Sequence, residues 1–471
     1  MAELLGTVSS PPSHMSPASR GWFPRTESSL FASEMDQFVE PNSTKLVVVM
    51  CGLPARGKSY ISKKIRRYMN WMGVRCEVFN VGNYRRQHVT GTQDHTFFDQ
   101  KNESNNKLRT QLAMDVLEEL IKWLQTGGGH VAIHDATNTT RARRAQILER
   151  ISHEPNINVL FVESICRKDD ILAQNIALKL QSPDYKETPP EQALEDFKAR
   201  LASYEEVYEG LDENADRDIS YIQLIDIGQR VIANSIHGYL PSQIAFYLMN
   251  YHISPRRIWL TRHGESTDNV LGRIGGDAGL SDRGFDFSEE LRDFMLSPKG
   301  SQRFSVWSSC LVRAVQTVGP IISTCKKMGD KSPLLKVHRI RALNELYAGS
   351  CEGMTYRQIQ TLLPDEFQAR EKNKLHYRYP NGGESYVDLI ERLKPIIIEL
   401  ERETSDVLLV AHNAVVRTII GYFTDTPSEQ LPFLEVPLHQ LICLTPTPFG
   451  CNIDHIFLNT QSESSLEEDD I

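Results

Sequence analysis

The sequence lacks the features of several protein classes. Its eight cysteines are scattered without a C-x-x-C pair, so we expect the reduced, mostly buried thiols of a cytoplasmic protein. No apolar run approaches the roughly 18 residues of a membrane span, and the amino terminus has no apolar secretory core. The formal net charge of −9 argues against a nucleic-acid-binding protein, because phosphate backbones favour net positive charge. We therefore expect neither a membrane nor a nucleic-acid partner.

The length and composition are those of a globular protein with two or three domains. The chain has 471 residues, of which 40% are hydrophobic and 24% charged. Residues 1–42 are rich in Ser, Pro and Gly, and we expect a flexible arm there. Residues 25–29 of this arm (RTESS) are either a phosphate acceptor or part of a plain solvated tail. The polar, acidic residues 460–471 are expected to be disordered.

Two series of apolar runs alternate with helical stretches. The first begins with KLVVVMCG at Lys45, a continuous apolar run typical of a strand buried on both faces. It continues with CEVFNVG, HVAIHDAT, NVLFVES and ISYIQLID. The second series follows Pro255 and contains RIWLTRH, FSVWSS, LLKVHRI, VLLVAHN and LHQLICLTPT. Because strands that alternate with helices form parallel sheets, we predict two α/β domains, residues 43–252 and 253–459.

A phosphate-binding loop follows the first apolar run. Residues 52–59 have the spacing G-x-x-x-x-G-K-S between a predicted strand and a predicted helix, which is the context that this motif requires. Glycine lets backbone N–H groups face phosphate oxygens, and the helix amino terminus adds partial positive charge. Lysine supplies charge to the β- and γ-phosphates, and serine can ligate Mg²⁺. We predict that a nucleotide binds to Gly52, Leu53, Pro54, Ala55, Arg56, Gly57, Lys58 and Ser59.

One carboxylate and several basic residues follow other predicted strands. Asp135 ends the run HVAIHD, where it either holds Mg²⁺ or helps activate a hydroxyl nucleophile, or instead caps the helix expected near Thr139. Residues that follow parallel strands meet at one edge of a sheet. Several arginines there would suit a phosphorylated acceptor, although each taken singly is also compatible with an ordinary surface position. The basic residues are Arg85, Arg86, Arg109, Arg143, Lys179 and Arg200.

Two histidines and two arginines follow strands in the second half. Arg262 and His263 end RIWLTRH, His412 ends VLLVAH, and Arg313 follows VWSSCLV. We do not expect zinc at His263, because no second His lies three or four residues on and no Cys cluster is near. A histidine satisfied in the core is the alternative. Gathered at one edge, these residues would form an anion pocket in which a neutral imidazole attacks phosphorus, with Glu345 as proton donor to the leaving alkoxide.

Many motifs together resemble one enzyme family. GLPARGKSYISKKI, FNVGNYRR, DATNTTRARR, FVESIC, SPDY, RHGES, GRIGGD, GMTYRQIQ and RYPNGGESY occur in the order found in the bifunctional 6-phosphofructo-2-kinase/fructose-2,6-bisphosphatases. The resemblance covers about residues 45–459. It implies a P-loop kinase domain followed by a histidine phosphatase domain related to phosphoglycerate mutase. It also implies that ATP and Mg²⁺ are used, that fructose 6-phosphate and fructose 2,6-bisphosphate are the sugar substrates, and that the protein is a homodimer.

The resemblance assigns roles to matching positions. In the kinase half, Asp135 would be the catalytic carboxylate and Cys166 would lie near the site. Fructose 6-phosphate would contact Arg85, Arg109, Thr137, Arg143, Lys179, Arg200 and Tyr204. In the phosphatase half, His263 would carry the phosphoryl group and Glu345 would donate the proton. The phosphoryl group would be held by Arg262, Asn269, Arg313 and His412, and the rest of the bisphosphate by Gly275, Tyr356, Arg378, Asn413 and Arg417.

Two stretches depart from the family pattern. A lysine often follows RYP in the family, whereas this chain has Asn381, Gly382 and Gly383. Asn413 stands where the family usually has Gln. These changes favour, as an alternative, a protein in which only one of the two activities is significant. A sugar-phosphate sensor without turnover and a kinase–phosphatase that processes nucleic-acid ends are the other hypotheses. Interleaved aromatic and basic stripes, which the last would need, are absent from the sequence.

Overall fold

The computed structural model describes residues 44–89, 94–99, 101–186, 188–226, 229–252, 255–447 and 450–458. The predicted arm (1–42) and acidic tail (460–471) lie outside this part of the chain. The described strands form two six-stranded sheets, one on each side of residues 253–254. We propose that the domain boundary lies there, as the sequence indicates. All eight cysteines are free thiols, and six of them are buried.

The first sheet has the strand order β2-β3-β1-β4-β5-β6. Its strands are β1 (Lys45–Cys51), β2 (Cys76–Asn80), β3 (Val131–Asp135), β4 (Ile157–Ile165), β5 (Tyr221–Ile225) and β6 (Arg230–Asn234). The first five are parallel, whereas β6 is antiparallel to β5. The sheet is therefore parallel, as predicted, except for one antiparallel strand at this edge. A connection of only four residues joins β5 to β6, too short for a parallel crossover.

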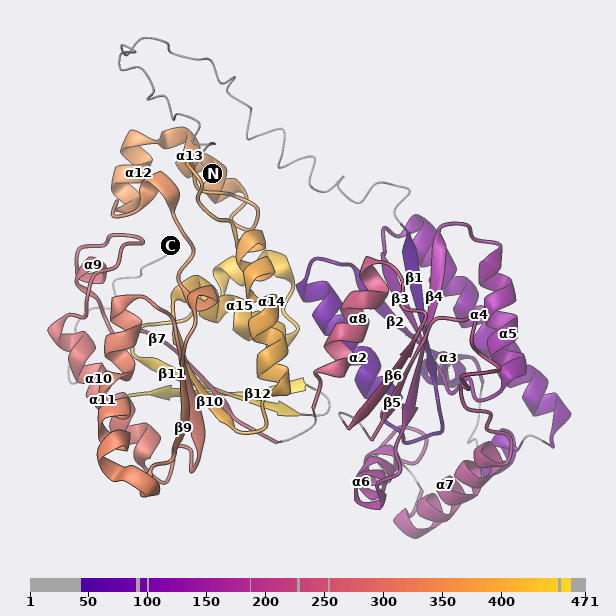
Figure 1. Cartoon of the computed structure of the whole chain (residues 1–471). Coiled ribbons are helices and arrows are strands. Elements are labelled where there is room, and N and C mark those ends of the chain that lie inside the picture. The colour runs from indigo at the N-terminus through magenta and orange to yellow at the C-terminus, as the bar shows by residue number, and fades with distance from the viewer. Residues whose placement is uncertain are drawn as a thin grey trace, which may run out of the picture. The chain divides into compact units, whose positions relative to one another are not determined.

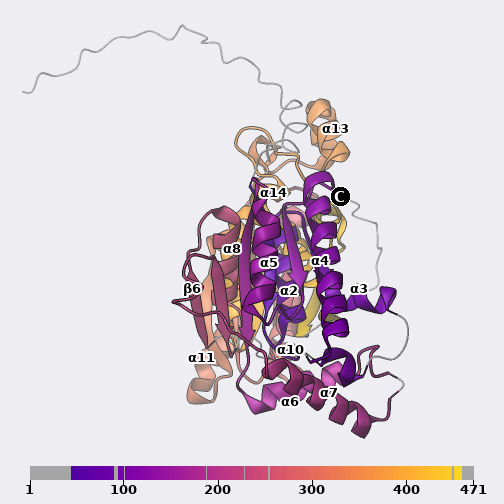
Figure 2. The ribbon, with the colours of Figure 1, turned by 90° about the vertical axis from the view of Figure 1, so that its right-hand side faces the viewer.

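Helices cover both faces of this sheet (Figures 1 and 2). They are α2 (Lys58–Trp71), α3 (Val81–His88), α4 (Glu103–Thr126), α5 (Arg141–Ser152), α6 (Asp169–Leu180), α7 (Pro190–Glu205) and α8 (Tyr239–Met249), with a 3-10 turn at His95–Phe98. Alternate side chains of β1 explain the layers, because successive residues of a strand point to opposite faces. Val47 and Val49 pack with α4 and α5, and Val48 and Met50 pack with α2 and α8. Helices α6 and α7 lie beyond the carboxyl end of the strands (Figure 1).

The second sheet has the order β12-β11-β7-β10-β8-β9. Its strands are β7 (Ile258–Arg262), β8 (Phe304–Ser308), β9 (Leu334–Arg339), β10 (Asp406–Ala411), β11 (Gln440–Thr447) and β12 (Gly450–Phe457). The central strands β7, β10, β8 and β9 are parallel, and β11 is antiparallel to both β7 and β12. This sheet too is mixed rather than purely parallel, with its antiparallel strands at one edge.

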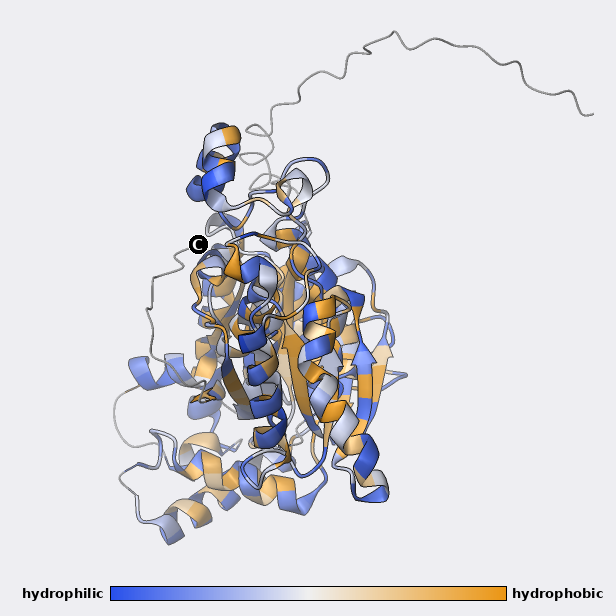
Figure 3. Ribbon diagram, turned by 90° about the vertical axis from the view of Figure 1, so that its left-hand side faces the viewer, coloured by the Kyte–Doolittle hydropathy of each residue, from blue (hydrophilic) through white to orange (hydrophobic). Residues whose placement is uncertain are grey.

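Helices cover the second sheet in the same way. They are α9 (Thr267–Val270), α10 (Asp282–Leu296), α11 (Val312–Met328), α12 (Tyr356–Leu362), α13 (Pro364–Lys372), α14 (Tyr386–Arg402) and α15 (Asn413–Thr424), with 3-10 turns at Gly329–Lys331, Arg341–Leu343, Gly349–Cys351 and Ser428–Phe433. Leu408 and Val410 of β10 pack with α10 and α11, whereas Val407 and Leu409 pack with α14 and α15. Figure 3 shows the resulting concentration of hydrophobic residues along the strands.

The two halves share a buried polar contact within the compact unit Ser43–Ile471. Glu401 near the end of α14 accepts hydrogen bonds from Arg67 of α2 at 2.6 Å and from the Tyr422 hydroxyl of α15 at 2.6 Å. Lys64 and Arg256 lie 3.4 and 3.3 Å from the same carboxylate. One carboxylate therefore joins α2, which begins at the phosphate loop, to α15, which begins directly after His412.

Candidate active sites

The phosphate loop has the backbone that phosphate binding requires. Gly52 and Gly57 have φ values of 122° and 83°, and Ala55 has φ 56°. A Cβ at Gly52 would lie 2.6 Å from the carbonyl oxygen of Ser164, so no side chain fits there. Gly57 precedes the first turn of α2, which exposes free N–H groups. The loop is thus formed as an anion cradle.

Lys58 and Asp135 lie next to each other at this loop. The Lys58 ammonium donates to the carbonyl of Leu53 at 2.6 Å. Burial lowers the pKa of Lys58 to about 7, although the charge of Asp135 opposes this effect. Asn80 donates to Asp135 Oδ2 at 2.5 Å. The helix-capping alternative for Asp135 is wrong, because Thr140 is the N-cap of α5 and accepts from Arg143 N. Asp135 is therefore available for the phosphate-binding site.

The segment after Asp135 is fixed to the phosphate loop. Gly52 N donates to the Thr137 carbonyl at 2.9 Å. The Asn138 side chain donates to the Met50 carbonyl at 2.9 Å and to His134 Nδ1 at 3.2 Å, while His134 Nε2 lies 3.0 Å from the Ala113 carbonyl. These bonds place Thr137 beside the loop.

Asp184 forms ion pairs with three of the predicted arginines. Arg85 bonds both of its carboxylate oxygens, at 2.8 and 2.7 Å. Arg86 and Arg200 lie 3.3 and 3.6 Å from it. The Arg200 guanidinium also lies 3.5 Å from the ring centroid of Phe98. Asp184 was not identified from the sequence, because its position depends on how the turn after α6 packs against α3 and α7.

A second group of basic side chains lies near Arg200. Arg143 donates to the Thr110 hydroxyl at 2.5 Å, and Arg109 donates to Asn106 at 3.4 Å. Burial lowers the pKa of both guanidinium groups, and the nearby Tyr204 opposes the shift. Buried guanidinium nitrogens of Arg85, Arg109 and Arg200 lack a partner among the described residues. Orphaned buried donors are rare in native proteins and fit an anionic ligand.

Lys179 and Cys166 lie at the same end of the sheet. Burial lowers the pKa of Lys179, whereas Asp135 raises it, which puts this ammonium close to the carboxylate. Cys166 directly follows β4, the neighbour of β1. Burial raises the pKa of its thiol. The thiol is therefore protonated near neutral pH, and this argues against a nucleophilic role for Cys166.

His263 is held in one tautomer by its own loop. Its Nδ1 lies 2.7 Å from the Gly264 carbonyl oxygen, which can only accept, so Nδ1 carries the proton. Arg313 Nε then donates to the Nε2 lone pair at 3.0 Å. Burial, with Arg313 and Arg262 nearby, holds the pKa of His263 well below its usual value of 6.5. His263 is therefore a neutral imidazole whose Nε2 faces a guanidinium, not a core histidine.

Several other predicted site residues lie close to this imidazole. The ring of His412 lies 5.1 Å from that of His263. Arg313 also donates to the Gly276 carbonyl at 2.8 Å. Glu352 accepts from Gly276 N and, at 2.8 Å, from Ala348 N, so one carboxylate fixes two loops of the site. The close approach of Glu352 leaves no room for a Cβ at Gly275, which has φ 70°.

Glu345 lies within electrostatic reach of Arg313, whose pKa it raises against the effect of burial. Leu346 N donates to its carboxylate at 2.9 Å. Tyr386 is half-buried, its hydroxyl lies 3.4 Å from the Arg417 guanidinium, and the charges of Arg417 and Glu345 both act on it. Glu345 and Arg417 thus both lie near Tyr386, the last residue of the motif RYPNGGESY, which was not among the predicted site residues.

The side-chain oxygens of Asn269 and Asn413 differ in their hydrogen bonding. The side-chain oxygen of Asn269 accepts from the amide and hydroxyl of Ser266 and closes the capping box of α9. Asn413 is the first residue of α15, directly after His412. Its buried Oδ1 has no partner among the described residues. Asn413 therefore presents an acceptor at the site, whereas the oxygen of Asn269 is engaged locally.

Among the described residues, the ion-pair partner of Arg378 is not one of the other predicted site residues. Arg378 pairs with Asp388, and its side chain is 63% exposed. Tyr356 is held by Arg370 at 3.3 Å. Asn381 and Gly382 follow in left-handed conformations, with φ 59° and 83°. Lysine would be strained at such a φ, which gives a local reason for Asn381 in this turn.

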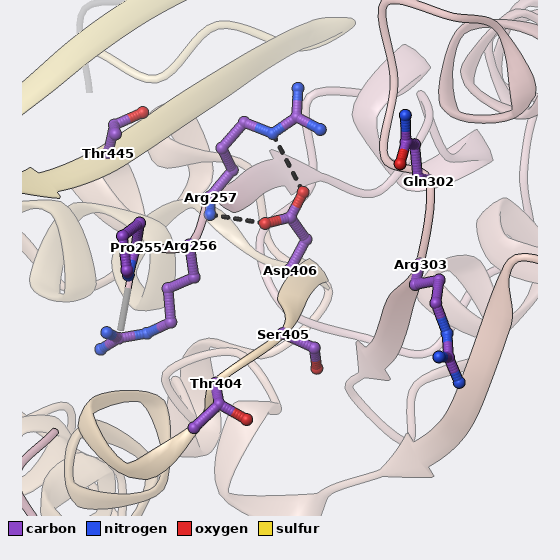
Figure 4. Close-up of a pocket in the computed structure, with 9 residues that line it drawn as sticks. All are labelled: Pro255, Arg256, Arg257, Gln302, Arg303, Thr404, Ser405, Asp406 and Thr445. Atoms are coloured by element: carbon purple, nitrogen blue, oxygen red, sulfur yellow. Dashed lines mark hydrogen bonds and ion pairs between the residues drawn. The ribbon is translucent and has the colours of Figure 1, made fainter. Parts of the chain in front are cut away.

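A solvent-accessible pocket of about 440 Å³ lies at the opposite, amino-terminal end of the second sheet (Figure 4). It is lined by Pro255, Arg256, Arg257, Gln302, Arg303, Thr404, Ser405, Asp406 and Thr445. Arg257 already pairs with Asp406 at 2.9 Å, and Arg256 with Glu401. Sites on parallel sheets lie at the carboxyl ends of the strands, so we do not assign this pocket to catalysis.

In the described part of the chain, no helix is long and apolar enough to cross a membrane. The same residues contain no cluster of three or more His, Cys, Asp or Glu that would hold a metal ion. Mg²⁺ usually binds through one or two carboxylates together with substrate phosphates. Ser59 and Asp135 beside the phosphate loop fit that arrangement.

Comparison with known proteins places both sites in one family. Residues 34–255 match the family described as 6-phosphofructo-2-kinase, and residues 258–459 match the histidine phosphatase superfamily (branch 1). The chain is 46% identical over 414 residues to "6-phosphofructo-2-kinase/fructose-2,6-bisphosphatase 4" of Rattus norvegicus, which covers 88% of this chain and 85% of the relative. The human protein of the same name is 47% identical with the same coverage. A Gallus gallus "6-phosphofructo-2-kinase/fructose-2,6-bisphosphatase" is 44% identical over 90% of this chain and 87% of its own length. The chain belongs to the 6-phosphofructo-2-kinase/fructose-2,6-bisphosphatase family.

Proposed function

We propose that this protein is a bifunctional enzyme that synthesises fructose 2,6-bisphosphate from ATP and fructose 6-phosphate and hydrolyses it back to fructose 6-phosphate. One observation carries this function. A single chain holds a phosphate loop beside Asp135 and, in a separate sheet, His263 bonded to Arg313 beside His412. The first site suits transfer from a nucleotide, and the second suits a histidine relay.

The kinase reaction is assigned to the first site. The phosphate loop and Lys58 bind the triphosphate, and the pocket of Arg85, Arg109, Arg143, Lys179 and Arg200 binds the phosphate of fructose 6-phosphate. The sugar 2-hydroxyl attacks the γ-phosphorus, the bond from that phosphorus to the β–γ bridging oxygen breaks to release ADP, and Asp135 orients the hydroxyl and takes up its proton. When bound, Mg²⁺ neutralises charge on the β- and γ-phosphate oxygens, and Ser59 and Asp135 are the residues that would hold it. Thr137 and Tyr204 complete the sugar site, with Cys166 lining it.

The phosphatase reaction is assigned to the second site. The neutral Nε2 of His263 attacks the 2-phosphorus, and the bond to the sugar oxygen breaks. Glu345 gives its proton to that oxygen. Arg262, Arg313, Asn269 and His412 stabilise the charge on the transferring phosphoryl group. Water then attacks the phosphorus, loses a proton to Glu345 and releases inorganic phosphate. Gly275, Tyr356, Arg378, Asn413 and Arg417 are proposed to contact the remainder of the bisphosphate.

Purified protein tests this function directly. With ATP, Mg²⁺ and fructose 6-phosphate it is expected to form fructose 2,6-bisphosphate. With 2-³²P-labelled bisphosphate it is expected to release labelled phosphate and to carry acid-labile label on His263. A protein that bound these sugars without either turnover would be a sensor, and the proposal would be wrong. Neither comparison favours the alternative of one dominant activity, since both domains match their families.

The setting of the enzyme is a further part of the proposal. We propose that it works in the cytoplasm as a homodimer without nucleic-acid or membrane partners, in keeping with the family resemblance and the acidic composition. Light scattering after size-exclusion chromatography measures the assembly. A mass of twice 53.6 kDa is expected, and a mass of 53.6 kDa would exclude the dimer.

A further inference from the structure

Ser309, at the end of the neighbouring strand β8, forms a hydrogen bond with His412. Ser309 directly follows β8, and His412 directly follows β10, which pairs with β8 through Val410 and Ser308. Ser309 N donates to the Val410 carbonyl at 3.1 Å, which fixes the backbone. The Ser309 hydroxyl then lies 2.7 Å from His412 Nε2, and both residues are completely buried.

The direction of this hydrogen bond follows from its surroundings. Leu311 N already donates to the Ser309 oxygen at 3.2 Å. If His412 Nε2 also donated to that oxygen, the serine proton would be left in a buried site without an acceptor among the described residues. Leaving a buried polar hydrogen unpaired costs about 1–3 kcal/mol. Donation by Nε2 would leave both the serine O–H and the Nδ1 lone pair unpaired among the described residues, whereas donation by the hydroxyl leaves only the Nδ1–H unpaired, so we assign the hydroxyl as the donor and Nε2 as the acceptor.

This direction determines where the imidazole proton lies. Burial, together with Arg313 and Arg262, holds the pKa of His412 well below 6.5, so the ring is neutral and has one N–H. Since Nε2 accepts from Ser309, the proton lies on Nδ1. Nδ1 is buried and has no partner among the described residues. Its ring lies 5.1 Å from that of His263, the proposed nucleophile.

We propose that Ser309 is a positioning residue of the phosphatase site, whose hydroxyl holds His412 as the Nδ1–H tautomer and so presents this N–H to the transferring phosphoryl group. The inference rests on the proposed phosphatase function. Without the hydroxyl, the ring is free to place its proton on Nε2, where it points toward the space vacated by the serine and not toward the phosphoryl oxygens.

Ser309→Ala is the test, and Ser308→Ala is the matched control. Ser308 is the neighbouring residue and is also completely buried, but its hydroxyl has no partner among the described residues. Removing the hydrogen-bond partner that orients a metal-ligating histidine typically costs about 10–100-fold in metal affinity or activity, and we take the same order of magnitude for His412. We expect Ser309→Ala to lower phosphatase kcat by about that factor, with KM for the bisphosphate changed far less. Kinase activity is expected to remain in both variants and Ser308→Ala to keep phosphatase kcat.

A spectroscopic readout separates this proposal from the phosphatase function itself. Histidine-selective ¹⁵N NMR of the full chain, assigned with His412→Gln, is expected to show a protonated Nδ1 and an unprotonated Nε2 at His412. Ser309→Ala should lose this pattern, and Ser308→Ala should keep it. The measurement needs no turnover, so it still decides the tautomer in a protein without phosphatase activity. An Nε2–H tautomer in the wild type, or an unchanged tautomer and kcat in Ser309→Ala, would overturn the proposal.

Discussion

Arg313 donates from Nε to His263 Nε2 at 3.0 Å, the atom proposed to attack phosphorus. In the free protein the lone pair of the nucleophile is therefore occupied by the guanidinium that would later hold the phosphoryl oxygens. Substrate must take this hydrogen bond from His263. The same contact keeps a positive charge beside the ring and so disfavours its protonation.

Arg313→Ala is expected to abolish most phosphatase turnover. The variant loses a donor to the equatorial phosphoryl oxygens, and loss of one such donor costs about 10²–10³-fold in kcat. Kinase activity is expected to be unchanged. Arg292→Ala is the matched control, because Arg292 lies on α10 of the same half and pairs with the exposed Glu289 and Asp293. Equal phosphatase kcat in the two variants would contradict the role of Arg313.

His263 is expected to remain neutral as the pH falls through 6.5. Its pKa is lowered by burial first and by Arg313 and Arg262 next, so the unprotonated ring persists at pH values where a free histidine is charged. Imidazole NMR shifts of the ligand-free protein, assigned with His263→Asn, measure this titration. A midpoint near 6.5 for His263 would show that the buried guanidinium groups do not control its charge.

Nucleotide binding is expected to take up a proton at Lys58. The pKa of this lysine is about 7 in the free protein, chiefly through burial, and a bound triphosphate raises it. Between these two values binding is coupled to protonation, so affinity falls as pH rises above about 7. Calorimetry of a non-hydrolysable MgATP analogue at pH 7.5, in buffers of different ionisation enthalpy, measures the uptake. Lys58→Arg, which stays charged, is expected to show none; equal uptake in both proteins would assign the proton elsewhere.

Glu401→Gln is expected to destabilise the protein by about 3–5 kcal/mol, because three buried cations lose their carboxylate. Burial alone would raise the pKa of Glu401, but Lys64, Arg67 and Arg256 lower it to about 2. This stabilisation is therefore complete above pH 4.5 and is lost as pH falls toward 2. Urea unfolding at several pH values measures it, with the exposed pair Glu399–Arg402 as the site of the control Glu399→Gln. If the wild type and Glu401→Gln differed no more at pH 7 than at pH 2.5, this account of the cluster would be wrong.

The sequence predicts the central strands well because they are buried on both faces. KLVVVMC and DVLLVA are continuous apolar runs and form β1 and β10. By contrast, β6 (RVIAN) and β12 (GCNIDHIF) are edge strands with mostly exposed or half-buried residues, so they carry no such run. Their antiparallel pairing depends on short connections, which the alternation of strands and helices does not reveal.

The same limit applies to the sites. His263, His412 and Arg313 could be predicted because each follows a strand of one parallel sheet. Asp184 lies in the motif SPDY, which does not reveal its ion pairs with three arginines. Glu352 and Ser309 could not be predicted, because each acts through a tertiary contact that no motif encodes. Ser309, for example, reaches His412 only through the register that pairs Ser308 with Val410. Arg378 shows the converse. The family motif predicts that it contacts the substrate, whereas in the structure it forms an ion pair with Asp388.

The central claim is that one chain carries two independent phosphoryl-transfer sites. Its most direct test is to measure kinase and phosphatase rates on the same preparations of wild type, Asp135→Asn and His263→Ala. We predict that the wild type has both activities, that Asp135→Asn loses only kinase activity and that His263→Ala loses only phosphatase activity. A wild type with a single activity, or a substitution at one site that abolishes both rates in a folded protein, would contradict the account.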